Sequence, residues 1–575
     1  MTQIFSKQSW RHTLVLGIFC AVSLVLVWRA FDLQVLNNTF YKDKGANTHI
    51  RMEALPAYRG IITDRHDEPL AISTPVDSVW VNPKIFANEI DEVSVIAEIL
   101  NLNAQKLLQR IATRQHKGFV YLKRRINPDL ASRLDALDIP GLYMQREYRR
   151  FYPTGEVSAH VLGFTNIDDM GQEGIEYAYD AWLQGQSGSL RVLQNRRGQI
   201  VSNIEKLSER QEGKSLSLSI DKRLQYLAYK ELKAAVKHHN ALSGSFIILD
   251  VSTGEVLAMV NQPAFNPNSR NRNADGRYRN RAFTDVFEPG STLKPIAIAA
   301  AVEQGYVTDS TLIDTSPGQF YVGRNLIKDV KNYGQINIET IIQKSSNVGI
   351  SKVALSMDKE VLWQTLVGFG FGSLTGAGFP GEASGTVNDF YRWRRIDQAT
   401  VSYGYGLSTS LAQLARAYAV IANQGRIIPL SMLKVTTKPE SQQVISPSTS
   451  QSVLNMMEQV VSTEGTAPLA RIEGYRVAGK TGTVKKIGAK GYSSKHYLSL
   501  FAGIVPASQP RLVGVVMIDD PSEGDYYGGI VAAPVFSKVM SVALRMMNIY
   551  PDDLLAINAA KNTASVVNRP EVSTL

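Results

Sequence analysis

Two residues at the start of an apolar stretch have the types and spacing of a nucleophile and its base. Ser291 and Lys294 lie three positions apart in FEPGSTLKPIAIAA (287–300), a predicted buried helix, and residues three apart share one face of a helix. A serine hydroxyl attacks efficiently only when a base takes its proton. Apolar surroundings lower the pKa of a lysine, so its neutral amine can be that base. The N–H groups of the first helical turn suit an oxyanion. The stretch predicts covalent catalysis in which Ser291 attacks and Lys294 accepts its proton.

The S-x-x-K spacing by itself is weak, because it occurs four times, at Ser219, Ser291, Ser356 and Ser431. Only Ser291 follows a Pro-Gly pair and precedes an apolar helix. Ser219 ends a predicted strand, and we expect it to cap the helix that follows. The other two serines precede no buried helix, so Ser291 is the candidate nucleophile.

Two further elements contribute residues that could assist a serine–lysine pair. KSSNVGIS carries Ser345 and Asn347 on a predicted helix, and VAGKTGTVKK carries Lys480 on a predicted strand. A hydroxyl, an amide and a second amine can relay protons and hold an amide substrate. Gly482 would let a substrate backbone approach closely if its strand lies at a sheet edge. Taken in order, the three elements predict one catalytic site.

The composition argues against several other chemistries. Cys20 is the only cysteine, so the chain has no intramolecular disulfide and no cysteine-based metal site, and its eight histidines form no H-E-x-x-H motif. We expect no metal and no cofactor. SYGYGLST (402–409) is glycine-rich but lacks G-K-[ST], so it predicts a turn before a packed helix rather than a nucleotide site.

The N-terminal region predicts a membrane anchor. Residues 13–28 contain no charge, and the apolar character continues to Leu33 past Arg29, whose long side chain can snorkel. Lys7 and Arg11 predict that the short leader before the anchor is cytoplasmic. A cleaved signal peptide is the alternative, but no clear small-x-small cleavage site follows. No later stretch is long and apolar enough to span. Most of the chain would then lie outside the cytoplasm, which argues against a nucleic-acid partner despite the net charge of +10.

The elements that must hold these residues follow an α+β pattern. A boundary near Lys214 precedes an amphipathic helix and two apolar runs, GSFIILDV and GEVLAMV, which predict a hairpin at the centre of a sheet. Residues 295–425 are mostly helical in pattern, and apolar strands follow at 497–506 and 511–519. Strands, a helical block and further strands indicate an α+β domain with an inserted helical part.

The order S-x-x-K, S-x-N, K-T-G is the signature of penicillin-binding proteins and serine β-lactamases. Over about residues 13–547 the chain resembles the class B penicillin-binding proteins, and among them the FtsI-type cell-division D,D-transpeptidases. Further matching stretches are RGIITDR, RRFYPTGEVSAHVLGF, GQEGIE, FPGE, SYGYGLSTSLAQLARAYAVIAN and YYGGIVAAPVF. One departure is His66-Asp67, where the family usually has Asn-Gly. That turn is expected in the pedestal, so it does not put catalysis in doubt.

The resemblance implies five segments: a cytoplasmic leader (1–12), a transmembrane anchor (13–33), an elongated mixed pedestal or dimerisation domain (34–213), a penicillin-binding transpeptidase domain (214–547) and a polar C-terminal tail (548–575). The transpeptidase domain is expected to have the serine β-lactamase-like fold, with a five-stranded antiparallel sheet and a helical subdomain. The protein would cross the inner membrane once, with its bulk in the periplasm.

The same resemblance implies peptidoglycan cross-linking in septal cell-wall synthesis. Ser291 would attack the D-Ala–D-Ala bond of a stem peptide and form an acyl-enzyme, which an amine of a second stem would resolve; β-lactams would acylate the same serine. Lys294, Ser345, Asn347 and Lys480 would complete the catalytic set, and Thr481, Gly482 and Thr483 would bind substrate. The N–H groups of Ser291 and Thr483 would form the oxyanion hole, and the hydroxyls of Thr481 and Thr483 would hold the terminal carboxylate. Expected partners are a membrane glycosyltransferase and other divisome proteins.

Several alternatives share these motifs. An elongation-type class B enzyme or a paralogue of the division enzyme would catalyse the same reaction, although KSSNVGIS and STPVDSVWVNP resemble the division type more. A β-lactamase or carboxypeptidase would pass the acyl group to water, and a penicillin sensor would use acylation as a signal. The leader is too short for a sensor's output domain. Class A β-lactamases carry E-x-x-x-N between S-x-N and K-T-G, and none of the six glutamates between residues 348 and 479 has an asparagine four positions on.

Overall fold

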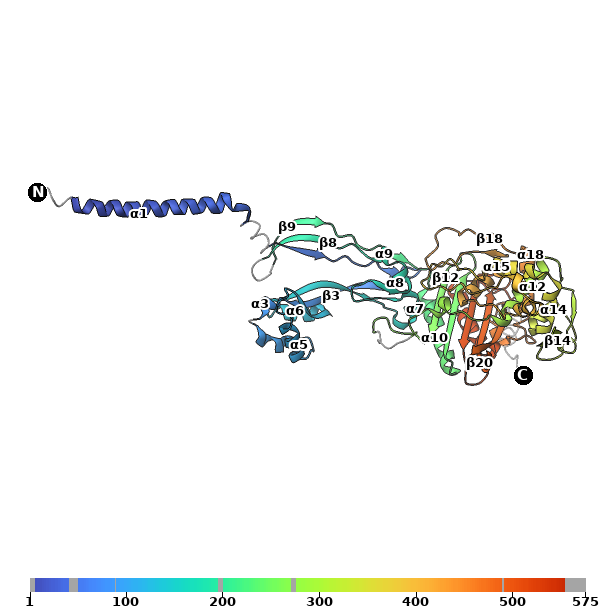
Figure 1. The fold of residues 1–575 in the computed structure, drawn as a ribbon. Coiled ribbons are helices and arrows are strands. Elements are labelled where there is room, and N and C mark those ends of the chain that lie inside the picture. The colour runs from blue at the N-terminus through green and yellow to red at the C-terminus, as the bar shows by residue number, and fades with distance from the viewer. Residues whose placement is uncertain are drawn as a thin grey trace, which may run out of the picture. The chain divides into compact units, whose positions relative to one another are not determined.

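The structure, a computed structural model, describes residues 6–40, 50–87, 89–194, 200–269, 276–488 and 491–553. The chain divides into two compact units, each built from non-consecutive segments (Figure 1). The first comprises residues 1–58, 74–149 and 185–213, and the second comprises residues 59–73, 150–184 and 214–575. Two segments that the sequence analysis assigns to the pedestal, 59–73 and 150–184, therefore pack within the second unit. The tail expected at 548–575 lies outside the described residues from 554 onward.

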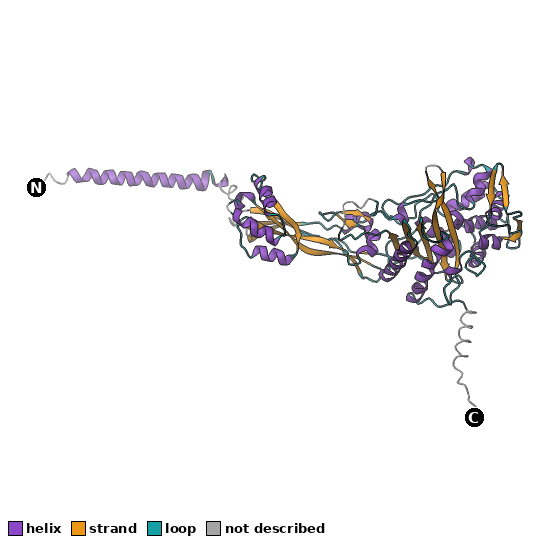
Figure 2. Cartoon of the chain, turned by 90° about the horizontal axis from the view of Figure 1, so that it is seen from below, coloured by secondary structure: helices purple, strands orange, loops and turns teal. Residues whose placement is uncertain are grey.

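A five-stranded antiparallel sheet forms the centre of the second unit, which confirms the predicted fold (Figure 2). Its order is β12-β11-β21-β20-β19, with every neighbouring pair antiparallel. The strands are β11 (Ser243–Asp250), β12 (Val256–Gln262), β19 (Ala478–Gly488), β20 (Gly491–Val505) and β21 (Leu512–Asp519). The register pairs Lys480 of β19 with Ala502 of β20.

The hairpin of β11 and β12 does not lie at the centre of this sheet, so that prediction was wrong. β12 is an edge strand, and β21 is the central one. Every residue of β11 and β12 is nevertheless buried, because helix α10 (Lys222–His238) packs along β12. A continuous apolar run indicates burial on both faces of a strand, but it does not indicate the position of that strand in the sheet.

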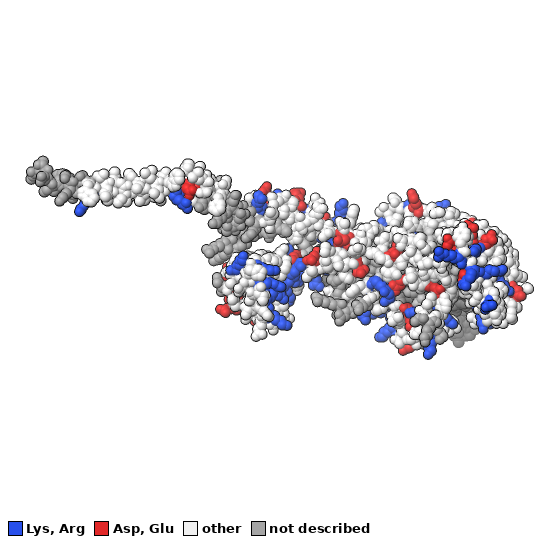
Figure 3. Space-filling view, in the orientation of Figure 1, with Lys and Arg blue, Asp and Glu red and all other residues white. Residues whose placement is uncertain are grey.

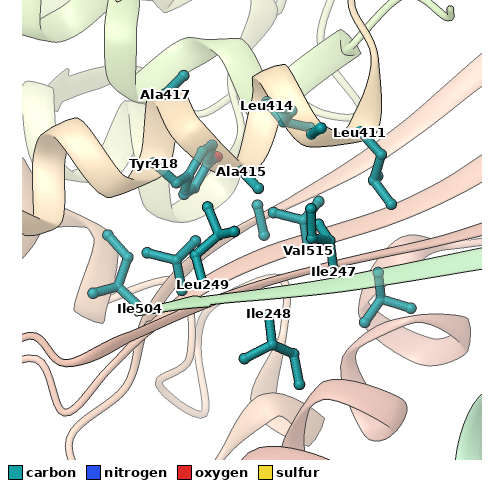
Figure 4. Close-up of a cluster of buried hydrophobic side chains, with 14 of the residues drawn as sticks. Ile247, Ile248, Leu249, Leu411, Leu414, Ala415, Ala417, Tyr418, Ile504 and Val515 are labelled. Carbon is teal, nitrogen blue, oxygen red and sulfur yellow. The ribbon is translucent and has the colours of Figure 1, made fainter. Parts of the chain in front are cut away.

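Helices cover both faces of the sheet. Helix α17 (Leu411–Ala422) packs on β11, β20 and β21, and helices α10 and α20 (Ala533–Met546) also pack on the sheet. Figure 4 shows Leu414 and Tyr418 of α17 pointing toward Ile247 and Leu249, whereas Ile248 points to the opposite side of the strand. This alternation is the period-2 pattern of a strand buried on both faces.

The chain between β12 and β19 forms the helical part of the second unit. Its helices are α11 (Arg281–Thr284), α12 (Lys294–Glu303), α13 (Ile338–Lys344), α14 (Asn347–Ser356), α15 (Lys359–Gly368), α16 (Arg395–Val401), α17 and α18 (Pro447–Glu458). It also holds three small ribbons that the sequence pattern did not predict. These pair β13 (Leu312–Asp314) with β16 (Gln335–Asn337), β14 (Gln319–Val322) with β15 (Asn325–Lys328), and β17 (Arg426–Ile427) with β18 (Gln442–Gln443). Val322 and Ile327 of the β14–β15 ribbon pack against Val348 of α14.

Shorter elements complete the second unit. They are β2 (Ile62–Thr63), α7 (Ala159–Leu162), β6 (Phe164–Thr165), β7 (Gly171–Glu173), α8 (Gly174–Ala178), α9 (Asp180–Leu183), β10 (Leu216–Ser217) and α19 (Gly528–Val531). β10 pairs in parallel with β2, so the segment before α10 joins the segment that carries RGIITDR.

The first unit contains two sheets. One has the antiparallel order β1-β8-β9, from β1 (Ile50–Leu55), β8 (Gly188–Gln194) and β9 (Ile200–Ser208). In the other, β3 (Pro69–Val81) pairs with β4 (Val120–Ile126) and β5 (Leu142–Phe151). Helices α3 (Pro83–Phe86), α4 (Val93–Ile99), α5 (Ala104–Ala112) and α6 (Pro128–Asp135) accompany this sheet, and Val79, Ile96, Leu122 and Leu134 belong to their common core.

Helix α1 (Ser6–Phe31) and the turn after it form an apolar segment that fits a single-pass membrane anchor. The segment Trp10–Leu36 has a mean hydropathy of 2.3 and is not buried, and Figure 3 shows few charged side chains along it. Contrary to our expectation, a second helical segment, Gly528–Met546, is also long and apolar enough to span a membrane. It is 56% buried because α20 packs on the sheet, so it is a core helix of the second unit.

Candidate active site

Ser291 lies in a tight turn that leads directly into a buried helix. The 3-10 turn covers Gly290–Leu293, and Lys294 is the first residue of α12. Gly290 has φ of +55°, and a Cβ there would lie 2.4 Å from Cγ2 of Val484, so this entry requires glycine. Lys294 and the seven residues after it are all buried. The serine hydroxyl thus stands at the entrance of an apolar helix.

The Lys294 amine contacts two of the three sequence elements. Its Nζ lies 3.0 Å from Ser291 Oγ, 3.1 Å from Ser345 Oγ and 2.8 Å from Asn347 Oδ1. It also donates a hydrogen bond to the main-chain oxygen of Ser345 at 2.6 Å. Four contacts from one buried amine hold the S-x-x-K turn against the S-x-N segment.

Ser345 connects the amine of Lys294 to the third element. It ends α13 in the left-handed conformation, with φ of 60° and ψ of 41°, which residues other than glycine seldom adopt. Its Oγ lies 3.1 Å from Lys294 Nζ and 2.9 Å from Lys480 Nζ. One hydroxyl therefore bridges two lysines that come from α12 and β19.

The K-T-G stretch lies on β19, an edge strand of the sheet. Lys480 is fully buried, and the Thr481 hydroxyl lies 2.9 Å from that of Thr466. Gly482 faces the serine turn, because a Cβ there would lie 3.0 Å from Cγ2 of Thr292. Thr483 Oγ1 accepts a hydrogen bond from the N–H of Gly528 at 3.2 Å. An edge strand leaves main-chain groups free for an extended substrate.

The two lysines have no carboxylate within hydrogen-bond distance among the described residues, and their pKa values are lowered. Burial lowers the pKa of Lys294 well below the ordinary lysine value, and the charge of Lys480 lowers it further, while the more distant Asp329 acts in the opposite direction. Burial lowers the pKa of Lys480 to about 7. A neutral amine next to Ser291 is therefore accessible near neutral pH.

The other S-x-x-K serines have structural contacts. Ser219 is buried, and its Oγ donates to the main-chain oxygens of Val256 and Ser431. Our prediction that Ser219 caps α10 was wrong: Asp221, the residue directly before the first helical position, accepts from the first free N–H groups. The hydroxyls of Ser356 and Ser431 donate to nearby main-chain oxygens.

Three residues outside the predicted set also support the site. Asp329, after the β14–β15 ribbon, accepts hydrogen bonds from the start of α14. Tyr418 of α17 donates to the main-chain oxygen of Thr292 at 2.7 Å, and Thr466 contacts Thr481. Each acts across a long sequence separation, so no local pattern marks it.

Two family models match the chain. The penicillin binding protein transpeptidase domain matches residues 244–541, and the penicillin-binding protein dimerisation domain matches residues 54–218. The first match contains all eight predicted site residues.

Known proteins are similar over nearly the whole chain. Peptidoglycan D,D-transpeptidase FtsI of Escherichia coli K12 is 42% identical over 569 residues, which cover 98% of this chain and 96% of that protein. Probable peptidoglycan D,D-transpeptidase PbpC of Pseudomonas aeruginosa is 40% identical over 548 residues, covering 95% and 97%. The crystal structure of penicillin binding protein 3 from Mycobacterium tuberculosis, complexed with aztreonam, aligns with a TM-score of 0.68 and 26% identity, covering 87% of this chain and 98% of that one. The chain therefore belongs to the penicillin-binding proteins, and within them to the FtsI-type peptidoglycan D,D-transpeptidases.

Proposed function

We propose that five residues of this site catalyse D,D-transpeptidation of peptidoglycan stem peptides: Ser291, Lys294, Ser345, Asn347 and Lys480. The observation that carries the proposal is the position of the Lys294 amine, 3.0 Å from Ser291 Oγ and 3.1 Å from Ser345 Oγ. A buried amine in this place can take the proton of the nucleophile and return it through a second hydroxyl.

Acylation begins when neutral Lys294 accepts the Ser291 proton. Ser291 Oγ then bonds to the carbonyl carbon of the penultimate D-alanine, and the N–H groups of Ser291 and Thr483 stabilise the oxyanion. The C–N bond breaks, and the departing D-alanine amine receives a proton from Ser345. Ser345 regains a proton from the lysines that flank it. The products are an ester on Ser291 and free D-alanine.

Transfer of the acyl group follows the steps of acylation in reverse order, with the amine of a second stem in place of D-alanine. The acceptor amine of a second stem attacks the ester carbonyl and gives up a proton to the lysine–serine relay. The ester C–O bond breaks, Ser291 recovers its proton, and a new peptide bond joins the two stems. The amide of Asn347, which already contacts Lys294, would hold the stem backbone.

The two threonines of the K-T-G-T stretch would recognise the terminal carboxylate of the donor stem, or that of a β-lactam. Thr481 and Thr483 lie two apart on β19, so their side chains leave the same face of the strand. The Thr481 hydroxyl contacts Thr466, and the Thr483 hydroxyl accepts from the N–H of Gly528. These contacts would hold both threonine side chains in the rotamers that bind the carboxylate.

A β-lactam adduct should be long-lived. Hydrolysis of the ester needs a base that activates water, and among the described residues no carboxylate hydrogen-bonds Ser291 or Lys294. Glu382, which lies between the second and third elements, accepts instead from the N–H and hydroxyl of Thr375. Lys294 would be committed to acylation and transfer.

The lifetime of the adduct tests the reaction class. The purified full-length chain in detergent is acylated with benzylpenicillin, free drug is removed, and the adduct is followed by intact mass. We expect one adduct per chain that persists for many minutes. Loss within seconds with turnover of the drug would identify a β-lactamase and reject the transpeptidase.

We also propose that the chain acts in septal synthesis at the inner membrane, with its N-terminus in the cytoplasm and the catalytic unit in the periplasm. The basic leader before α1 and the identity to E. coli FtsI support this. A membrane glycosyltransferase and other divisome proteins would be its partners. A paralogue of the division enzyme that catalyses the same reaction is the second candidate.

Depletion in the native host separates these roles. A division enzyme predicts rods that elongate without septa. Swollen, rounded cells would indicate the elongation type, and an absence of phenotype would indicate a paralogue. A fragment that begins near Asn38 should be soluble and still acylated; if it stays in the membrane fraction, a second membrane-binding element exists.

A further inference from the structure

The start of α14, which carries Asn347 of the S-x-N element, is held by a carboxylate from outside the three motifs. Oδ1 of Asp329 accepts from the main-chain N–H of Asn347 at 2.5 Å and of Val348 at 3.0 Å. Its Oδ2 accepts from Ser346 Oγ at 2.5 Å. Ser346 Oγ in turn accepts from the N–H of Gly349 at 2.8 Å. The first three N–H groups of the helix are therefore all bonded.

The residue before Asp329 fixes the Asn347 side chain from the other side. Asn347 Nδ2 donates to the main-chain oxygen of Lys328 at 3.2 Å, while Asn347 Oδ1 accepts from Lys294 Nζ at 2.8 Å. The amide is thus held between the catalytic amine and the Lys328–Asp329 segment. This orientation leaves Oδ1, and not Nδ2, toward the lysine.

Asp329 is also the carboxylate that acts on the charge of Lys294. Burial and the charge of Lys480 lower the pKa of Lys294, and the negative charge of Asp329 raises it. Within hydrogen-bond distance of Lys294 Nζ lie Ser291, Ser345 and Asn347, none of which is ionised. Around Asp329 itself, Lys328 and Lys331 are exposed neighbours in the chain. The pKa of Tyr333 is raised by burial and by the charge of Asp329.

We infer that Asp329 is a positioning residue for acylation, which aligns Asn347 with Lys294 through the N-terminus of α14 and supplies the negative charge that opposes the positive charges of the site. This inference rests on the proposed role of Lys294 as the base. A carboxylate at a helix N-terminus suits both tasks, because it satisfies free N–H groups and opposes the positive end of the helix dipole.

Asp329→Asn removes the charge at nearly constant size. Its amide oxygen can still accept from the N–H groups of Asn347 and Val348, but its amide nitrogen cannot accept from Ser346 Oγ. The loss of that hydrogen bond lets the start of α14 and the Asn347 side chain shift. A misplacement of about 1 Å costs on the order of 100-fold in rate, and we expect acylation by a fluorescent penicillin to slow about 10- to 100-fold. Loss of the charge also lowers the pKa of Lys294. The rate rises with pH as Lys294 loses its proton, so its half-maximal pH should move to a lower value.

Three variants of the full-length chain distinguish the effect of the Asp329 charge on acylation from the effect of its hydrogen bonds. Ser346→Ala loses hydrogen bonds of the same helix start but no charge, so the half-maximal pH should stay at the wild-type value. Asp314→Asn removes a carboxylate on β13, in the same part of the fold, and should leave both the rate and the pH profile unchanged. Asp329→Glu keeps the charge with displaced oxygens, so it should slow acylation at an unchanged half-maximal pH.

The outcome distinguishes this inference from the proposed function. If Lys294→Met still acylates at the wild-type rate, the proposed base is wrong. If Lys294→Met is inactive but Asp329→Asn keeps the wild-type rate and pH profile, Asp329 is not a positioning residue. If Asp329→Asn is acylated more slowly but keeps the wild-type half-maximal pH, the proposed effect of the Asp329 charge on Lys294 is wrong. If Asp329→Asn does not fold, a wild-type rate in Asp329→Glu would overturn the inference.

Discussion

A lysine pair and an arginine cluster, both buried in the second unit, differ in the partners of their cationic groups. The lysine pair, Lys294 and Lys480, has only hydroxyl, amide and main-chain partners. The arginine cluster consists of Arg59 and Arg150 on either side of Glu176, with exposed side-chain fractions of 2%, 1% and 0%.

Both arginines of the cluster contact a carboxylate, although Nη2 of Arg150 has no hydrogen-bond partner. Nε of Arg59 and Nε of Arg150 each lie 2.6 Å from one carboxylate oxygen of Glu176, and Arg59 also reaches Asp180 at 2.7 Å. Burial alone would lower the pKa of Arg59, but the charges and hydrogen bonds of Glu176 and Asp180 outweigh it and raise the pKa. These cations stay charged and hold three separated chain segments together.

The comparison shows that carboxylate contacts raise the pKa of the buried cation Arg59, whereas burial without such contacts lowers the pKa of Lys294 and Lys480. Arginine keeps its proton under nearly all conditions, whereas lysine loses it readily when desolvated. At the lysine pair the result is a neutral amine beside a serine; at the arginine cluster it is a permanent ionic contact.

The largest effect should come from Ser291→Ala, which removes the nucleophile but no charge. Covalent labelling by a fluorescent penicillin should disappear, because the variant lacks the hydroxyl that lies at the entrance of α12 beside the Lys294 amine. Thermal unfolding should stay close to wild type. Ser356→Ala, another S-x-x-K serine, is the matched control and should label normally; labelling that survives in Ser291→Ala would reject the site.

Lys294→Met should slow acylation by roughly 100- to 10,000-fold, the usual contribution of a general base. The stopped-flow rate of penicillin acylation measures it. Because burial opposes protonation of this amine, and its removal offsets the four hydrogen bonds that are lost, the melting temperature should stay close to wild type. A variant that is both inactive and unfolded would assign a structural role to Lys294 instead.

Glu176→Gln should destabilise the second unit by about 3–5 kcal/mol, because it leaves two buried arginines without their shared carboxylate. Urea denaturation measures the loss. The exposed pair of Arg191 and Glu205 offers the control, since Glu205→Gln should change stability by less than about 1 kcal/mol. Equal effects of the two changes would mean that the arginine cluster does not depend on its counter-ion.

Lys480→Met should have the opposite sign and increase stability by about 1–3 kcal/mol at pH 6.5, since an apolar side chain replaces a buried unpaired amine. The folded-state pKa of about 7 lies below the unfolded value. The stability of the wild-type fold therefore decreases as pH falls from the unfolded-state pKa of Lys480 to about 7. Below pH 7 the full destabilisation is present. The gain should shrink between pH 7 and 10. Melting temperatures at pH 6.5 and 9.5 provide the measurement, with the exposed Lys538→Met as control. A gain independent of pH would contradict the lowered pKa.

Much of the site could be predicted from local sequence. Ser291 and Lys294 are three residues apart at the start of an apolar helix, so a single turn brings them together whatever the rest of the chain does. The apolar runs at 244–251, 254–260, 497–506 and 511–519 likewise indicated buried strands, whereas the five-stranded antiparallel sheet was implied only by the family resemblance. These features depend on spacing and composition, which a sequence shows directly.

The remaining features depended on contacts between distant residues. Lys480 meets Ser345 across 135 residues, and Asp329 reaches Ser346 from a ribbon that no periodicity marked. The position of β12 at the sheet edge, and the packing of segments 59–73 and 150–184 with the second unit, were equally hidden. A hydrophobic pattern indicates which face of an element is buried, but not which element covers it. Sequence alone thus determined the reactive residue types and their local geometry. Tertiary structure decided which lysines are buried without a carboxylate in hydrogen-bond contact, because that depends on every chain segment that packs around them.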